Sequence, residues 1–104
     1  MAFLDINPQT PGHTQVIPKK HYRWVWDLPT SAETKNANIA RYFEIVRKIA
    51  LAQRKAFKTD WIISKTVGDE VHHAHIWVFP GPDAKGHKSR LPENAKKLIE
   101  ALES

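Results

Sequence analysis

The sequence of 104 residues contains no cysteine and no long apolar run. Without cysteine there are no disulfides and no thiolate metal sites, so packing and hydrogen bonds must hold the fold together. The longest purely apolar segments are only a few residues long, well below the ~20 residues that a membrane-spanning helix requires. The N-terminus also lacks the basic and then apolar pattern of a signal peptide. We therefore expect a cytoplasmic protein with no membrane partner.

The length and the residue patterns predict one domain over residues 1–104, because a chain of this size is too short to build two cores. Short strands are expected over residues 2–6 and 14–17, joined by a turn-forming loop with two prolines and a glycine. Segments 60–66 and 71–79 are rich in β-branched and aromatic residues, which predicts a second antiparallel hairpin.

Two helices complete the predicted α+β fold. The first is expected to begin at Thr30 or Ser31, because Thr30 and Glu33 have the spacing of a capping box, and to continue to Phe57. A shorter helix is expected over residues 92–102, with a proline in its first turn. The long helix has an apolar stripe at helical spacing that should cover one face of a mainly antiparallel sheet.

Two segments leave alternatives open. Residues 24–26, Trp-Val-Trp, are consistent with an edge strand or with simple packing. The net charge of +5 is concentrated in residues 31–60, which contain seven lysines and arginines and three acids. A nucleic-acid interface would have such a charge, but so would the solvated face of a helix. No aromatic residue is interleaved on that charged face as a stacking platform. We therefore do not expect nucleic acid as a partner.

The strand expected over residues 71–79 contains the residues best suited to chemistry. Alternation places His73 and His75 on one face, about 6 to 7 Å apart, which is close enough for both to contact one phosphate. The opposite face has Ala74, Ile76 and Val78, which suit burial under the long helix. Neutral imidazole is a nucleophile and its cation donates hydrogen bonds to phosphate oxygens, so the pair favours phosphorus chemistry.

Two other interpretations of these histidines remain. His73 and His75 could bind a metal together with His13 or His21, as in three-histidine zinc sites. No carboxylate lies on the same strand face, and no local pattern brings the distant histidines near, so we expect neither a metal nor a cofactor. They could also be ordinary exposed histidines on a sheet edge.

The run from His73 to Pro80, His-Ala-His-Ile-Trp-Val-Phe-Pro, resembles the signature of the histidine triad (HIT) superfamily. That signature is His-apolar-His-apolar-His-apolar-apolar. Residues 68–72 resemble the lead-in of the same motif, and residues 3–21 resemble the family's N-terminal segment. The similarity covers roughly residues 2–80, with both motifs in the expected order and a helix between them. Relative to the family, we expect the domain to lack the usual N-terminal extension ahead of its first strand.

The resemblance implies a nucleotide-binding homodimer related to nucleoside phosphoramidases and dinucleoside polyphosphate hydrolases. His75 matches the nucleophile that attacks an α-phosphorus to give a nucleotidyl-histidine, and His73 matches the residue that orients it or contacts phosphate. His13 matches a further histidine near the site, and Asp5 matches the acid that binds the ribose hydroxyls. The candidates for the base pocket are Phe3, Leu4 and Ile6.

Three residues depart from the family pattern. Trp77 occupies the third histidine position, and an indole has no titratable proton with which to assist a leaving group. The transferase branch of the superfamily has glutamine there, so this change leaves catalysis possible. Asp69 and Glu70 stand where the family places glutamine and a small polar residue beside the phosphate, which is electrostatically unfavourable. We expect a nucleotide hydrolase or nucleotidyl transferase, with a catalytically degenerate nucleotide-binding or interaction module as the alternative.

Overall fold

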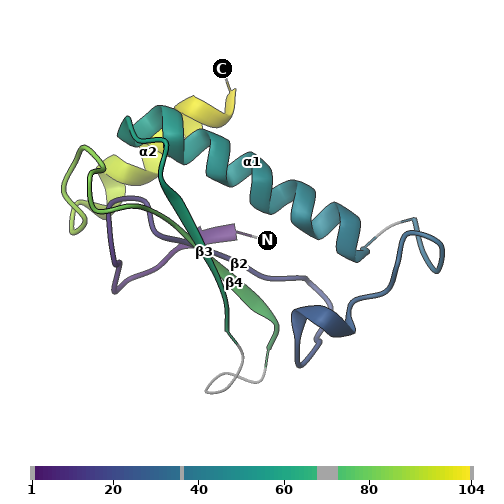
Figure 1. Ribbon diagram of the computed structural model, residues 1–104. Helices are drawn as coiled ribbons and strands as arrows, with labels where there is room; N and C mark the ends of the chain where they lie inside the picture. The colour runs from purple at the N-terminus through teal and green to yellow at the C-terminus, as the bar shows by residue number, and fades with distance from the viewer. Residues whose placement is uncertain (1, 36, 68–72, 104) are drawn as a thin grey trace.

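The computed structural model describes residues 2–35, 37–67 and 73–103, and Figure 1 shows its elements. In chain order they are β1 (Ala2–Leu4), β2 (Thr14–Val16), the 3₁₀ helix η1 (Val25–Asp27), α1 (Ile39–Phe57), β3 (Ile62–Val67), β4 (His75–Pro80) and α2 (Leu91–Glu103). Both α-helices lie on the same side of the sheet (Figure 1). The architecture is α+β, as the sequence predicts.

The four strands form one sheet in the order β1-β2-β4-β3, and every neighbouring pair is antiparallel. Phe3 pairs with Gln15, Gln15 with Trp77 and Trp77 with Lys65, so these four residues form a row across the sheet. Both predicted hairpins are therefore present. Strand β4 lies between β2 and β3. One of its faces packs against the helices, and the other faces away from them.

The helix-facing side of the sheet carries the main core. Ala74, the residue before β4, and Ile76 and Val78 of β4 are buried against α1, which confirms the alternation expected from the sequence. The buried residues of this cluster are Val16, Val25, Leu28, Tyr42, Val46, Ile49, Ala74, Ile76 and Val78. A second, smaller cluster of Ala52, Phe57 and Leu98 joins α1 to α2. None of the helices in the described part of the chain is long and apolar enough to cross a membrane.

Helix α1 begins at Ile39, eight or nine residues later than the sequence predicts. The Thr30–Glu33 pair does form, with the Glu33 amide donating to Thr30 Oγ1 at 3.3 Å, but it closes only a single turn. The true N-cap is Asn38, whose extended backbone interrupts the helix and whose Oδ1 accepts from the Arg41 amide at 2.9 Å. Both Thr30 and Asn38 thus act as caps, but only Asn38 is followed by a helix with a continuous buried stripe.

The segment at residues 24–26 forms no edge strand. Val25 begins η1 and is fully buried, whereas Trp24 and Trp26 remain exposed. Of the two alternatives, packing through Val25 is therefore correct. The C-terminal helix α2 agrees with the prediction to within one residue at each end.

Candidate active site

The side of the sheet opposite α1 bears the predicted site residues, and we call it the open face. It is defined by Phe3, Gln15, Lys65, His75 and Trp77, which alternate with the core residues of their strands. His13 precedes β2 by one residue, and its ring contacts that of Trp77 at a centroid distance of 5.1 Å. The fold thus gathers residues from the two hairpins that are more than sixty positions apart.

His75 is held in a single tautomer. Its Nδ1 lies 2.8 Å from the carbonyl oxygen of His73, and a carbonyl can only accept, so Nδ1 carries the proton and donates it. In the neutral ring, Nε2 therefore keeps its lone pair. The side chain is almost fully buried, at 5 % exposure, which fixes the direction of that lone pair. This is the protonation pattern that a nucleophilic imidazole needs.

His73 is anchored to the segment after β2. Its Nε2 lies 3.1 Å from the carbonyl oxygen of Pro18, so Nε2 donates and Nδ1 is the free acceptor in the neutral ring. The ring of His21 packs edge-on against it at 5.1 Å. His73 is half-buried. Its backbone carbonyl and side chain together connect His75 to the segment that follows β2.

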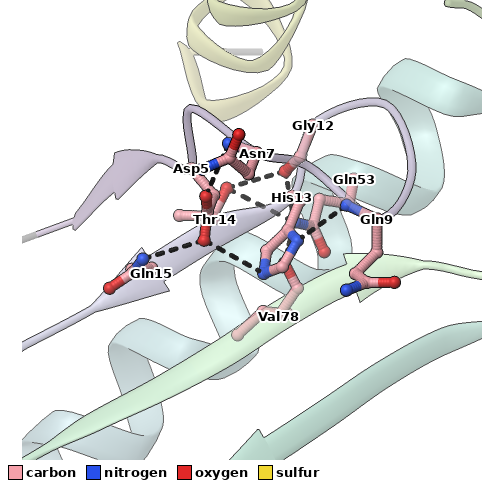
Figure 2. Close-up of polar contacts among 9 residues, drawn as sticks. All are labelled: Asp5, Asn7, Gln9, Gly12, His13, Thr14, Gln15, Gln53 and Val78. Atoms are coloured by element: carbon pink, nitrogen blue, oxygen red, sulfur yellow. Dashed lines mark hydrogen bonds and ion pairs between the residues drawn. The ribbon is translucent and has the colours of Figure 1, made fainter. Parts of the chain in front are cut away.

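His13 is fully buried beside the open face, and Figure 2 shows its two ring nitrogens pointing to different partners. Nδ1 accepts from the Gln9 amide at 3.0 Å, which leaves the proton of the neutral ring on Nε2. Nε2 lies 3.9 Å from Asp5 Oδ2 and has no hydrogen-bond partner among the described residues. Burial lowers the pKa of His13, and the nearby Asp5 carboxylate only partly offsets this.

Asp5 is positioned by three further hydrogen bonds around the same loop. Its Oδ2 accepts from Gln15 Nε2 at 2.8 Å and its Oδ1 accepts from the Asn7 amide at 2.8 Å (Figure 2). The Asp5 amide in turn donates to the carbonyl oxygen of His13 at 2.9 Å. The carboxylate is thus held as an acceptor near the rim of the open face, with its side chain 12 % exposed.

Trp77 lies between His13 and Lys65. The Lys65 ammonium lies 5.5 Å from the centroid of the indole ring, in a cation–π contact. The indole Nε1 is buried and has no hydrogen-bond partner among the described residues. Phe79, the next residue on this face of β4, also contacts the His13 ring, at a centroid distance of 4.9 Å.

The three candidates for the base pocket do not lie on the same side of the sheet. Phe3 lies in the row with Gln15 and is 44 % exposed, and Ile6 in the following loop is 80 % exposed. Leu4 pairs with Thr14 and packs towards the small cluster around Phe57, on the helix-facing side. The structure therefore does not bring Leu4 together with Asp5 and His13. Asp69 and Glu70 lie outside the described residues.

Several residues that support the site have no signal in the sequence motif. Gln53 of α1 is fully buried, and its Nε2 donates to the carbonyl oxygens of Gly12 and Val78, each at 2.8 Å (Figure 2). Gly12 has φ of +78°, and a Cβ there would lie 2.2 Å from a ring carbon of Phe57. The loop that carries His13 is thus fixed by a helix residue and by a position that only glycine fits.

Gln15 was also missed, although a signal existed for it. It lies two residues after His13 at the start of a strand, so alternation places both on one face. Lys65 could be placed only once the register of β3 and β4 was known. Among residues 2–35, 37–67 and 73–103, no group of three or more histidine, aspartate and glutamate side chains could hold a metal ion.

Comparison with known families decides the classification. Residues 1–84 match the HIT domain model. The chain belongs to the HIT domain family. An uncharacterized HIT-like protein of Saccharolobus solfataricus is 39 % identical over 85 residues, covering 77 % of this chain and 57 % of the relative. The adenosine 5'-monophosphoramidase of Saccharomyces cerevisiae is 31 % identical over 84 residues, covering 81 % of this chain and 50 % of the enzyme.

A solved structure gives the same result in three dimensions. The HIT-like protein of Bartonella henselae, described as involved in cell-cycle regulation and crystallised with an unknown ligand, superposes with a TM-score of 0.76. It is 36 % identical, and the match covers 96 % of this chain and 78 % of that one. The chain thus spans little more than half the length of some of the relatives that it matches.

Proposed function

We propose that this protein is a HIT-type nucleotide-binding hydrolase or nucleotidyl transferase in which His75 attacks the α-phosphorus. The observation that carries the proposal is the hydrogen bond from His75 Nδ1 to the His73 carbonyl, because it directs the lone pair to Nε2. Membership of the HIT family and similarity to a phosphoramidase support the same conclusion.

In this proposal His75 Nε2 forms a bond to the α-phosphorus as the bond to the leaving group breaks. The electron pair departs with the leaving group. Water, or another acceptor hydroxyl in a transferase, then attacks the phosphorus. The nitrogen–phosphorus bond breaks to restore the imidazole, and the attacking hydroxyl releases its proton to solvent. Asp5 accepts hydrogen bonds from the ribose hydroxyls. His73 orients the neighbouring ring through its backbone carbonyl, or donates to the phosphate from Nδ1 when both of its ring nitrogens carry a proton.

Turnover of a fluorogenic nucleoside phosphoramidate and of a dinucleoside polyphosphate tests the proposal. We expect release of nucleoside monophosphate from at least one of them and loss of that activity, by about 10³-fold or more, in His75→Ala. The matched control is His87→Ala, because His87 is an exposed histidine in the loop before α2. Activity that is equal in the wild type and in His75→Ala would refute the proposal.

The second candidate is a nucleotide-binding or interaction module that has lost catalysis, and the observation that favours it is Trp77 beside the nucleophile. It predicts that adenosine monophosphate binds while no substrate turns over. It further predicts that a denaturing quench at alkaline pH, under which a nitrogen–phosphorus bond survives, traps no nucleotidyl-protein when the protein is mixed with substrate. A phosphorus adduct detected by mass spectrometry on the peptide containing His75 would exclude this alternative.

We also propose that the protein forms a homodimer through the outer edge of β3, which pairs only with β4 in the described sheet. An unpaired strand edge is a template for pairing with a second chain, and Trp61 beside it is 54 % exposed. Light scattering coupled to size exclusion should give twice the mass of one chain. A Trp61→Glu variant should shift that mass towards the monomer.

A further inference from the structure

A pocket lined by lysines lies where the loop between β4 and α2 passes the end of α1 (Figure 1). Its volume is about 360 Å³, near the lower limit of the range of about 300–1,000 Å³ that is usual for small-molecule pockets. We call it the lysine pocket, and its charged lining residues are Lys55, Lys58, Lys85, Lys97 and Glu100. The described lining therefore has a net positive charge. None of these residues belongs to the set that defines the open face.

The four lysines come from three segments that the fold holds together. Lys55 lies in the last turn of α1 and Lys58 follows that helix, whereas Lys97 lies on α2. Lys85 lies in the loop between β4 and α2, and its amide donates to the carbonyl oxygen of Phe57 at 2.7 Å. This hydrogen bond fixes the loop to the end of α1. The cations are thus brought to one place by the tertiary structure and not by a run of lysines in the sequence.

Gly86 leaves room beside the ammonium of Lys97. Its φ of +124° is in the region that favours glycine, and a Cβ there would lie 3.8 Å from Lys97 Nζ. Lys97 Nζ also lies 3.5 Å from Glu93 Oε1, one turn earlier on α2. This ion pair is solvent-exposed, so it holds the ammonium only weakly. Because an ammonium has three donors, Lys97 can bind a ligand in the lysine pocket while it keeps this contact.

Lys58 occupies a backbone position that glycine would fill at a lower cost. Its φ of 52° and ψ of 51° are left-handed, and helices that end in this conformation usually have glycine there. The C-terminal end of a helix attracts cations, which accounts for a lysine in the last turn of α1. That attraction is local and does not require lysines from the loop and from α2 to line the same pocket. An anion bound between the three segments would be stabilised by all four lysines.

We propose that the lysine pocket binds a small oligophosphate, an anion with several phosphate groups joined in a chain, at a site separate from the open face. The cations that line the pocket are all lysines, and an ammonium binds phosphate as a point charge, whereas carboxylates are matched best by the planar fork of arginine. Charges from three segments suit a chain, because each ammonium can contact a different phosphate. Such a chain occurs free, as inorganic triphosphate, and as the 5'-triphosphate of a nucleotide.

Titration of the wild-type protein with inorganic triphosphate, followed by calorimetry and by amide NMR spectra, provides the first test. We expect one triphosphate to bind per chain, with an affinity that falls as salt is added and with shifts of the amide signals of Lys58, Lys85 and Gly86. Absence of binding would overturn the proposal. So would shifts confined to His75 and Trp77, because they would place the anion on the open face.

Two further ligands identify the source of the chain. If the chain belongs to a nucleotide, adenosine triphosphate should shift the same amide signals at lower concentration than inorganic triphosphate does. If the chain is free, the order should be reversed. A single-stranded oligonucleotide provides the third comparison. If it shifted these signals at a lower phosphate concentration than either triphosphate, the pocket would be a nucleic-acid contact and the proposal would be overturned.

Substitution of single lysines tests whether the pocket or the general charge of the protein attracts the anion. Lys85→Gln and Lys97→Gln each remove one charged donor and should weaken triphosphate binding by about threefold or more. The matched control is Lys96→Gln, because Lys96 is an exposed lysine one residue earlier on α2 and does not line the pocket. It should keep the wild-type affinity. Equal effects of Lys96→Gln and Lys97→Gln would overturn the proposal.

Lys58→Gly separates a role in binding from a role in the fold. Glycine adopts the left-handed conformation more readily than lysine, so the variant should fold and its urea midpoint should equal or exceed that of the wild type. Its affinity for triphosphate should nevertheless fall by about threefold or more, because one ammonium is lost. A lower urea midpoint with unchanged affinity would show that Lys58 serves the fold alone, and it would contradict the proposal.

Discussion

The two faces of β4 have opposite requirements, although their residues alternate along a single strand. On the helix-facing side the side chains of Ala74, Ile76 and Val78 are buried in the apolar core against α1. On the open face His75 and Trp77 meet polar partners, and the indole Nε1 has no hydrogen-bond partner among the described residues. The first face contributes burial, which stabilises the fold. The second keeps polar atoms in place at some cost in stability, which is typical of functional sites.

The largest effect on stability should come from truncating the helix-facing side. Ile76 is 2 % exposed at the centre of the core, so Ile76→Ala should lower the free energy of unfolding by about 2–5 kcal/mol. For comparison, His73→Ala, three residues earlier, removes a half-buried ring with one hydrogen bond and should lower the free energy of unfolding by about 1 kcal/mol. Urea denaturation of both variants measures the contrast. If the two losses were equal, the distinction between the faces would be wrong.

Much of this contrast could be predicted from the sequence, because alternation is local. The positions of Ala74, Ile76 and Val78 follow from spacing alone, and so does the apolar stripe of α1. The start of α1 could not be predicted in this way, because the Thr30–Glu33 pair and Asn38 both satisfy capping rules. Only the packing of Tyr42 and later residues on the sheet decides between them.

The candidate site was predictable in its residues but not in its support. The histidines stand out by composition and family resemblance, whereas Gln53 contacts the His13 loop across 41 positions of sequence. No periodicity reports such a contact, and at helical spacing Gln53 is indistinguishable from the apolar residues beside it. Leu4 shows another limit of the sequence. It belongs to the segment that resembles the family's pocket, but strand alternation turns it to the helix-facing side.

Removal of the Gln53 amide should have the next largest effect on stability, because this residue joins α1 to β4 and to the loop that carries His13. Its Nε2 satisfies the carbonyl oxygens of Gly12 and Val78 in a fully buried position. Gln53→Leu keeps the volume and removes both hydrogen bonds, although the Gly12 carbonyl still accepts from Thr14 Oγ1 at 2.8 Å, so we expect a loss of about 1–3 kcal/mol in unfolding free energy. The exposed exchange Arg54→Leu, one residue later, is the control and should cost well under half as much. Equal costs would mean that Gln53 acts only through its size.

Acid should weaken the fold through His13. Its pKa in the folded protein lies below the ordinary value of 6.5, so the unfolded chain binds the proton more readily. The contribution of His13 is therefore fully present above pH 6.5, is lost as the pH falls through the folded pKa, and levels off below it. Urea midpoints at pH 8 and pH 5 should differ more in the wild type than in His13→Asn. His87→Asn, which removes an exposed histidine, should keep the wild-type difference, and a loss of pH dependence there would contradict the assignment.

The smallest effect on stability should come from the contact between Lys65 and Trp77. Variants of Lys65 can separate a structural role of this residue from a role in substrate binding. A cation–π contact at an exposed position is worth about 0.5–1 kcal/mol, so Lys65→Gln should lower unfolding free energy by no more than that. Lys20, whose ammonium lies 5.8 Å from the Tyr22 ring, provides a matched exchange outside the site. Lys65→Gln and Lys20→Gln should therefore have similar stability. If Lys65 also contacts the phosphate of a nucleotide bound on the open face, only Lys65→Gln should lower kcat/KM, and equal kinetics of the two variants would confine Lys65 to a structural role.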